Sequence, residues 1–238
     1  MHVAGSMDIE IFSDVKCPWC FVGKRRFEKA LAAFPHRDQV NVTWRSFQLD
    51  PSLPEHYEGT EQQYLAERKG IPAERVRRMW DNLVTQAAGE GLDFRFDDVV
   101  VGNSFTAHRF LHLAKAHGLG AEAKEAVLSA HFEQGKDTSD VEFLVSLGTS
   151  IGLAEGEIRS TIGSDRFADD VRQDIEEARS LGVSGVPFFV IDRKYGISGA
   201  QPTEVFADAL ASYWKEANPL TMVAASSDAE ACGPDGCN

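Results

Sequence analysis

The sequence predicts an α/β fold in which a small sheet is interrupted by a large all-helical insertion. Three observations support this. Residues 8–47 show a strand–helix–strand pattern, residues 54–183 carry little strand signal, and strand signals return over residues 186–198. A chain of 238 residues that is 43% hydrophobic can bury a full core around such a sheet.

The opening pattern predicts two neighbouring strands. Residues 8–13 alternate polar and apolar side chains, as half-buried strands do. Apolar residues then recur at helical spacing over residues 18–34, and residues 40–47 give a second strand. Because a helical crossover joins the two strands, we expect them to pair in parallel.

The insertion is predicted to consist of helices alone. Asn103 or Ser104 can cap one of them and Ser139 or Asp140 another, and glycines stand where several should end. The helices are expected over residues 61–70, 72–89, 104–118, 121–134, 140–152 and 155–181. After the insertion, residues 186–191 and 195–198 predict a hairpin, and a last helix follows Pro202.

These patterns divide the chain into four parts. Residues 7–53 and 184–217 form one domain, and residues 54–183 form the helical insertion domain. Residues 218–238 are small and polar, which predicts a flexible tail. Residues 1–6 resemble a cloning remnant and lack the apolar core of a secretory signal, so we expect a native start at Met7 and a cytoplasmic protein.

Charge and hydropathy exclude two classes of partner. The formal net charge of −13 repels phosphate backbones, so no nucleic acid is expected. No stretch approaches the roughly 18 uninterrupted apolar residues that span a bilayer, so no membrane partner is expected.

The four cysteines form two close pairs, which indicates redox chemistry rather than a framework of structural disulfides. The first pair, Cys17 and Cys20, stands between a predicted strand and a predicted helix. Cys17 is expected at the N-cap and Pro18 at the first helical position, so that free backbone N–H groups stabilise a Cys17 thiolate. Cys20, one turn further, is then the resolving thiol. Lysines beside the motif favour the thiolate, whereas Asp14 opposes it.

A zinc site is the main alternative for this pair. Zinc needs two further ligands, and the nearest histidine, His36, lies beyond the predicted helix. The strand–CxxC–helix context therefore favours thiol exchange, with no metal and no bound cofactor.

The Cys17-Pro18-Trp19-Cys20 motif, the helical insertion and the late Gly185-Val186-Pro187-Phe188 segment resemble the DsbA family over residues 8–217. The resemblance implies a thioredoxin fold with Pro187 in cis beside the cysteines, and with Val186 offering its backbone to a bound peptide. It further implies disulfide exchange with the thiols and disulfides of proteins, and glutathione is a further candidate partner. The FrnE-like cytoplasmic branch of the family is the most similar, through residues 103–109 and 135–140.

Two other functions remain open. Related glutathione-dependent enzymes, the 2-hydroxychromene-2-carboxylate isomerases and kappa-type transferases, typically carry serine where Cys17 stands. A peptide-binding chaperone module that uses the cleft near Pro187 is the other alternative. The presence of both Cys17 and Cys20 favours dithiol exchange over either.

Several other residues are candidates for the site or for structural roles. Trp19, within the motif, is expected to be partly exposed and to contact substrate together with Pro18. Asn103, His108 and Arg109 either line a pocket that faces the cysteines or cap and decorate a helix, and the second interpretation is favoured. The other histidines of the insertion, His112, His117 and His131, are expected at the surface or with satisfied partners.

The tail carries the second cysteine pair, Cys232 and Cys237, around a Gly-Pro-Asp-Gly turn. Such a turn brings two cysteines within disulfide range, which predicts a second redox pair that exchanges with the first. Free thiols in an incidental tail are the alternative.

Overall fold

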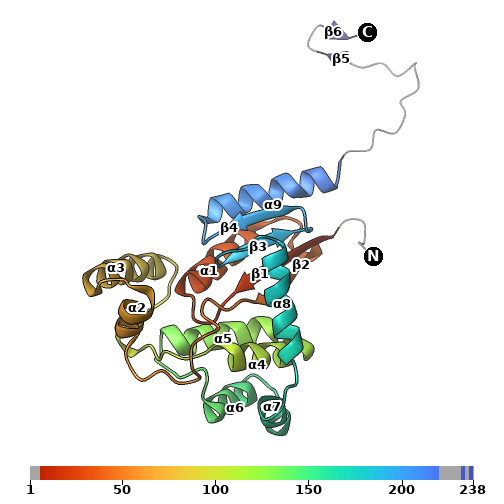
Figure 1. Cartoon of the computed structure of the whole chain (residues 1–238). Coiled ribbons are helices and arrows are strands. Elements are labelled where there is room, and N and C mark those ends of the chain that lie inside the picture. Colours follow the sequence, from red (N-terminus) through yellow and green to blue (C-terminus); the bar gives the residue numbers. More distant parts are fainter. Residues whose placement is uncertain (1–5, 220–231, 234–235, 238) are drawn as a thin grey trace.

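The computed structural model describes residues 6–219, 232–233 and 236–237 and contains a mixed sheet in the order β2-β1-β3-β4 (Figure 1). The strands are β1 (Met7–Ser13), β2 (Val40–Ser46), β3 (Phe188–Ile191) and β4 (Tyr195–Ser198). Strand β1 pairs with β2 in parallel, as predicted, and with β3 antiparallel. Strands β3 and β4 form the predicted hairpin.

Helices cover both faces of this sheet. On one face, Ile9 and Ile11 pack with Phe27 of α1 (Pro18–Ala33) and Phe206 of α9 (Thr203–Ala217). On the other face, Phe12 packs against α8 (Ala168–Ser180), the last helix of the predicted insertion. Because successive residues of a strand point to opposite faces, β1 contributes to both cores.

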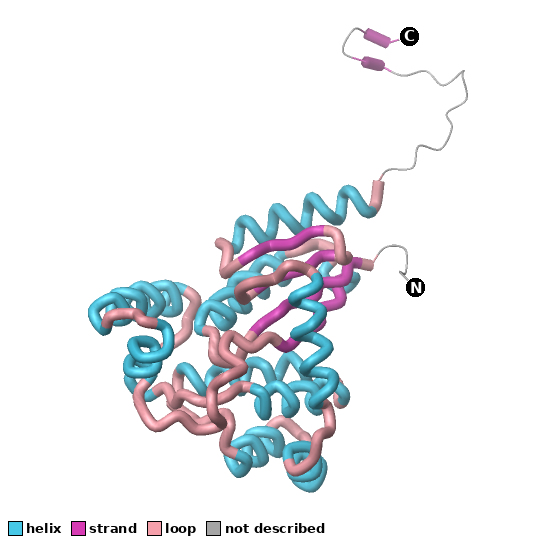
Figure 2. Tube along the Cα trace, in the orientation of Figure 1, coloured by secondary structure: helices cyan, strands magenta, loops and turns pink. Residues whose placement is uncertain are grey.

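The remaining helices lie beside the sheet, at the end where β1 leads into α1 (Figures 1 and 2). They are α2 (Glu61–Lys69), α3 (Ala73–Gly89), α4 (Phe105–Ala116), α5 (Gly120–Phe132), α6 (Val141–Ser150) and α7 (Glu155–Ile162). Two 3₁₀ turns, Arg37–Gln39 and Phe96–Asp98, lie between larger elements. Val15, just before the motif, is buried with Phe110 of α4, and Phe21 is buried with Phe94. The insertion therefore packs over the end of the sheet that carries the cysteines.

One predicted helix is in fact two. The sequence suggested a single helix over residues 155–181, but α7 ends at Ile162, Gly163 follows, and α8 begins at Ala168. The Arg109 guanidinium of α4 binds four backbone carbonyls in this break, those of Thr161, Ile162, Ser164 and Arg166. A contact with a distant helix thus satisfies the carbonyls that a continuous helix would have paired internally.

In the tail, the backbone of Cys232–Gly233 pairs antiparallel with Gly236–Cys237, so that Cys232 lies opposite Cys237. The rest of the predicted tail beyond residue 219, and the predicted remnant over residues 1–5, lie outside the described residues. Among the helices of the described part, none is both long and apolar enough to cross a membrane.

Candidate active site

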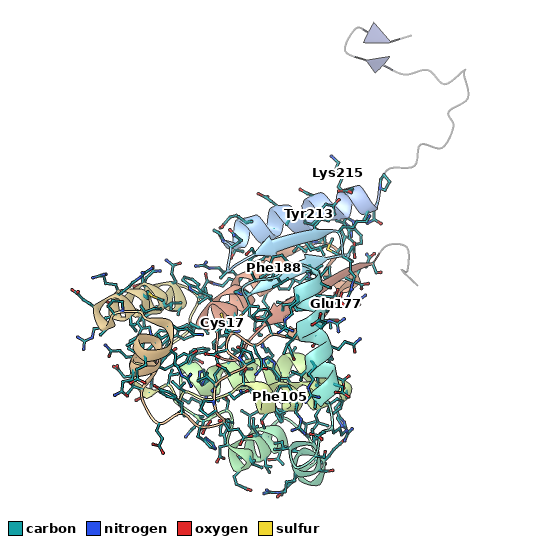
Figure 3. The ribbon with its side chains drawn as sticks, viewed as in Figure 1. Cys17, Phe105, Glu177, Phe188, Tyr213 and Lys215 are labelled. Atoms are coloured by element: carbon teal, nitrogen blue, oxygen red, sulfur yellow. The ribbon has the colours of Figure 1, made fainter. Side chains whose placement is uncertain are left out.

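Cys17 occupies the N-cap of α1, and Pro18 is the first helical residue, as expected. The backbone of Cys17 is extended, with φ −101° and ψ 109°, which turns the chain from β1 into the helix. Proline suits this position because its missing N–H has no partner in the first turn of a helix. Cys17 is 4% exposed and Cys20 is fully buried, so Cys17 is the more accessible of two covered sulfurs. Figure 3 shows Cys17 between the sheet and the helices of the insertion.

A second segment, residues 185–188, lies against the cysteines. The Val186–Pro187 peptide bond is cis, as the family resemblance implied. The Sγ of Cys17 donates a hydrogen bond to the carbonyl oxygen of Val186 at 3.4 Å. Val186 is half-buried and Pro187 is buried. Two segments that are about 170 positions apart in the sequence thus meet at one sulfur.

Gly23 makes room for this segment inside α1. A β-carbon on Gly23 would lie 2.9 Å from Cγ of Pro187 and 3.4 Å from the backbone of Ala200. Because no β-carbon normally comes within 3.0 Å of a neighbouring atom, the Pro187 ring can approach the helix only where the side chain is absent.

We therefore expect Gly23→Ala to lower the free energy of unfolding by about 1–3 kcal/mol, the usual cost of an extra methyl group in a packed interior. The matched control is Gly156→Ala in α7, where a β-carbon meets nothing within 4 Å. This control should raise stability by about 0.5–1 kcal/mol, because alanine favours helices. Urea unfolding of both variants checks the contrast, and equal effects would show that Gly23 is not needed for the packing.

Asp14 lies buried next to the motif, and its carboxylate is hydrogen-bonded to two backbone N–H groups and one imidazole. Its carboxylate accepts hydrogen bonds from the N–H groups of Lys16 (3.3 Å) and Leu49 (2.8 Å) and from Nε2 of His108 (3.3 Å). Burial raises the pKa of Asp14, but these partners, His108 above all, bring it below its usual value. Burial also lowers the pKa of His108, so a neutral imidazole donates to a charged carboxylate. This buried charge lies close enough to Cys17 to raise the pKa of its thiol.

The two thiols are hydrogen-bonded to one another and titrate as a pair. The hydrogen bond with Cys20 and burial raise the pKa of Cys17 well above its ordinary value, and the Cys20 N–H at the helix N-terminus offsets this only in part. For Cys20, burial raises the pKa, but the bond from Cys17 and the charge of Lys124 lower it overall. The backbone N–H at the helix N-terminus thus favours a Cys17 thiolate, as expected, while burial and Asp14 oppose it, and the opposite shifts belong to the pair as a whole.

Lys124 and Glu61 are titratable residues near the site that the sequence did not single out. Lys124 of α5 is 2% exposed, and burial lowers its pKa to about 8. Burial likewise raises the pKa of Glu61 to about 7 and lowers that of Lys16, whose ammonium reaches the Val100 carbonyl, to about 8. No sequence signal marks Lys124 or Glu61, because each is buried by elements that are distant in the chain.

Asn103, His108 and Arg109, the three candidates from the sequence in and before α4, have different roles in the structure. Ser104 is the N-cap of α4 and makes no side-chain capping bond, whereas Asn103, one residue earlier, accepts a hydrogen bond from the N–H of Phe105 at 2.8 Å. Arg109 binds the carbonyls in the break after α7. His108 alone of the trio reaches the cysteine region, through Asp14. Trp19 and Pro18 are half-buried, and Trp19 packs beside α3.

The other histidines have different environments. Nε2 of His112 lies 3.0 Å from Asp174 and 3.2 Å from Ser46, and exposed His117 pairs with Glu157. His131 differs from expectation, because it is buried and its Nδ1 has no hydrogen-bond partner in the described part of the chain. Among residues 6–219, no group of three or more histidine, cysteine or carboxylate side chains could hold a metal ion.

Comparison with known proteins agrees with this geometry. The family model for the DSBA-like thioredoxin domain matches residues 8–211. The chain belongs to this family. Its structure is similar to that of a probable DsbA oxidoreductase from Streptomyces coelicolor, with 47% sequence identity, 98% of each chain covered and a TM-score of 0.85. The uncharacterized protein YwbO of Bacillus subtilis is 27% identical over 215 residues, which cover 89% of this chain and 99% of YwbO.

A solved structure of an isomerase has a similar fold. A 2-hydroxychromene-2-carboxylate isomerase is 13% identical, with a TM-score of 0.68 over 88% of this chain and 97% of that chain. At this identity the likeness concerns the fold alone. The family thus makes the chain a DsbA-like oxidoreductase with a thioredoxin fold, and the chemistry at the cysteines must distinguish its activity from that of the isomerase.

Proposed function

We propose that the protein exchanges disulfides with protein substrates through Cys17 and Cys20. The observation that carries the proposal is a pair of free, hydrogen-bonded thiols at the N-terminus of α1, with the more accessible cysteine facing the Val186 carbonyl. A single-thiol or serine site could bind glutathione, but it could not resolve a mixed disulfide internally.

The proposed reaction has two displacements. The Cys17 proton passes to Cys20, and the Cys17 thiolate attacks one sulfur of a substrate disulfide, whose other sulfur leaves as a thiolate. Cys20 then gives this proton to the departed substrate thiolate and attacks Cys17 Sγ, which releases the second substrate sulfur as a thiolate and leaves a Cys17–Cys20 disulfide. The substrate gains two electrons, one proton from the thiol pair and one from water, and the reverse sequence oxidises a dithiol.

Charged and backbone groups support both steps. The Lys124 ammonium lowers the pKa of Cys20, which favours its thiolate in the second displacement. The N–H of Val186 has no hydrogen-bond partner among the described residues, so it is free to pair with an extended substrate. Trp19 and Pro18, both half-buried next to Cys17, are the proposed side-chain contacts for that substrate.

A single-turnover experiment tests the proposal. The fully reduced protein is mixed with a peptide that contains one disulfide, without glutathione, and both products are followed by mass spectrometry. We expect one peptide disulfide reduced for each Cys17–Cys20 disulfide formed. A glutathione-dependent isomerase or transferase would show no exchange until glutathione is added, and a chaperone module would bind the peptide and leave its disulfide intact.

The second cysteine pair, Cys232 and Cys237, is the subject of a separate prediction. The side chains of Cys232 and Cys237 lie outside the described part of the structure, and a disulfide between them that exchanges with the first pair stays a prediction. The opposed backbone positions of the two cysteines are consistent with it.

A further inference from the structure

Strand β2 forms one edge of the sheet, and part of its backbone has no partner. The N–H of Phe47 binds the carbonyl oxygen of Ser13, so the odd-numbered residues of β2 direct their backbone groups towards β1. The even-numbered residues direct theirs away from the sheet. The outward N–H and C=O groups of Val42 and Trp44 make no hydrogen bond in the described part of the chain.

The two edges of the sheet differ in how they are protected. Strand β4, the other edge, has four residues, and the side chain of Gln201 binds the outward carbonyl of Ser198. Strand β2 has seven residues that pair with β1 without a bulge, contains no proline and carries one charged side chain, Arg45. Proteins usually blunt an exposed edge with short strands, prolines, bulges or charges, because an open edge pairs with other strands. The long open edge of β2 therefore indicates that another strand covers it.

A hollow of about 430 Å³ lies along this edge, between β2 and helices α1, α4 and α5. Val42 and Trp44 line it together with Phe27 and Leu31 of α1. Val42 is 36% exposed, so part of this apolar wall is open to solvent. A strand added to β2 would place every second side chain on the side of the sheet where this wall lies.

We propose that a second copy of the chain covers this edge, with the two β2 strands antiparallel about a two-fold axis at Thr43. In this register Val42 of each copy lies opposite the partner's Trp44, and each such pair exchanges two backbone hydrogen bonds. The free N–H and C=O groups of both residues are then all paired. The assembly requires no redox step, so it does not depend on the proposed disulfide exchange.

The side chains of β2 suit pairing with themselves. Val42 meets the partner's Trp44 on the face that packs on α1, and an aliphatic side chain beside an aromatic one is a favourable cross-strand pair. On the other face Thr43 meets the partner's Thr43, which is another favourable pair. Arg45 meets the partner's Asn41, so no like charges lie opposite each other. An unrelated strand would have to match this pattern, whereas a second copy supplies it by symmetry.

Single introduced cysteines test the register, in a full-length chain whose four native cysteines are serine. Opposite residues that do not exchange hydrogen bonds have Cα atoms about 4.5 Å apart, so Thr43→Cys should form a covalent dimer under mild oxidation. Asn41→Cys, at an exposed position, is the matched control. Its two copies would lie about 13 Å apart along the strands, beyond disulfide range, so it should not link. Equal linking of the two variants, or no covalent dimer in either, would overturn the proposal.

Sedimentation of the reduced wild-type protein measures the assembly itself, and we expect the dimer to predominate at high micromolar concentration. Thr43→Lys places two ammonium groups opposite each other and should shift the equilibrium to the monomer. Ser198→Lys, at an exposed position of the other edge, should leave the dimer intact. Val42→Pro removes an outward N–H and should also give the monomer, so it serves if the lysine variant does not fold. A wild-type monomer up to millimolar concentration, or dimers of the Thr43→Lys or Val42→Pro chain as stable as that of the wild type, would refute the proposal.

Discussion

Cys20→Ser should convert the protein into a trap that accumulates a mixed disulfide with a substrate peptide, whereas Cys17→Ser should abolish exchange. The more accessible sulfur, Cys17, is expected to attack first, and only Cys20 lies close enough to release the product. Without Cys17 the exchange rate should fall on the order of 10³-fold or more, as for the loss of a nucleophile in other enzymes. Without Cys20 the first displacement occurs and the second does not.

Both variants are best made in a chain in which Cys232 and Cys237 are also serine, so that each retains a single cysteine. Mass spectrometry of the protein after mixing with a disulfide-containing peptide then identifies the linkage without ambiguity. A mixed disulfide on Cys20 in the Cys17→Ser chain, formed as fast as that on Cys17 in the other chain, would contradict the assigned order of attack.

Lys124→Met should raise the stability of the reduced protein near neutral pH. Burial lowers the pKa of Lys124 from 10.5 to about 8 in the folded state, a penalty of about 3 kcal/mol below pH 8 that a methionine does not carry. Between pH 8 and 10.5 the unfolded chain binds more protons at this site than the folded chain, so the wild-type protein gains stability as the pH rises. The advantage of the variant should therefore shrink across this window and vanish near pH 10.5.

Lys24→Met is a matched control for that experiment, because Lys24 is also buried, at 4% exposure. Its ammonium, unlike that of Lys124, binds Glu28 and Glu125 at 2.6 Å each. Removal of this ammonium leaves Glu28 and Glu125 with Arg25 as their remaining cationic partner in the described part of the chain, so this variant should lose stability where Lys124→Met gains it. Urea unfolding of both variants at pH 7 and pH 10 measures the two signs, and a loss in both would show that Lys124 has a partner when the protein is folded.

Local sequence signals were sufficient for the order of the elements and for the position of the cysteines. A proline after Cys17 and alternation in residues 8–13 determine how a strand, an N-cap and a helix succeed one another. The cis bond before Pro187 came from family resemblance, since no local signal separates it from an ordinary edge proline.

The break between α7 and α8 was not predicted, although Gly163-Ser164 is a local hint. Apolar spacing continues on both sides of the break, so periodicity alone favoured one helix. The Arg109 guanidinium makes the break stable by binding the freed carbonyls, and it comes from a helix that ends about 50 residues earlier. Such a contact exists only after the chain has folded.

The sequence by itself determined that a reactive dithiol stands at the start of a helix beside a small sheet. The tertiary structure alone decided how that dithiol titrates, because the groups that shift its pKa values, Asp14 with His108 and Lys124, come from different elements. Hydrogen bonds within a turn follow from neighbouring residues, whereas desolvation and the field of distant charges depend on which segments pack together.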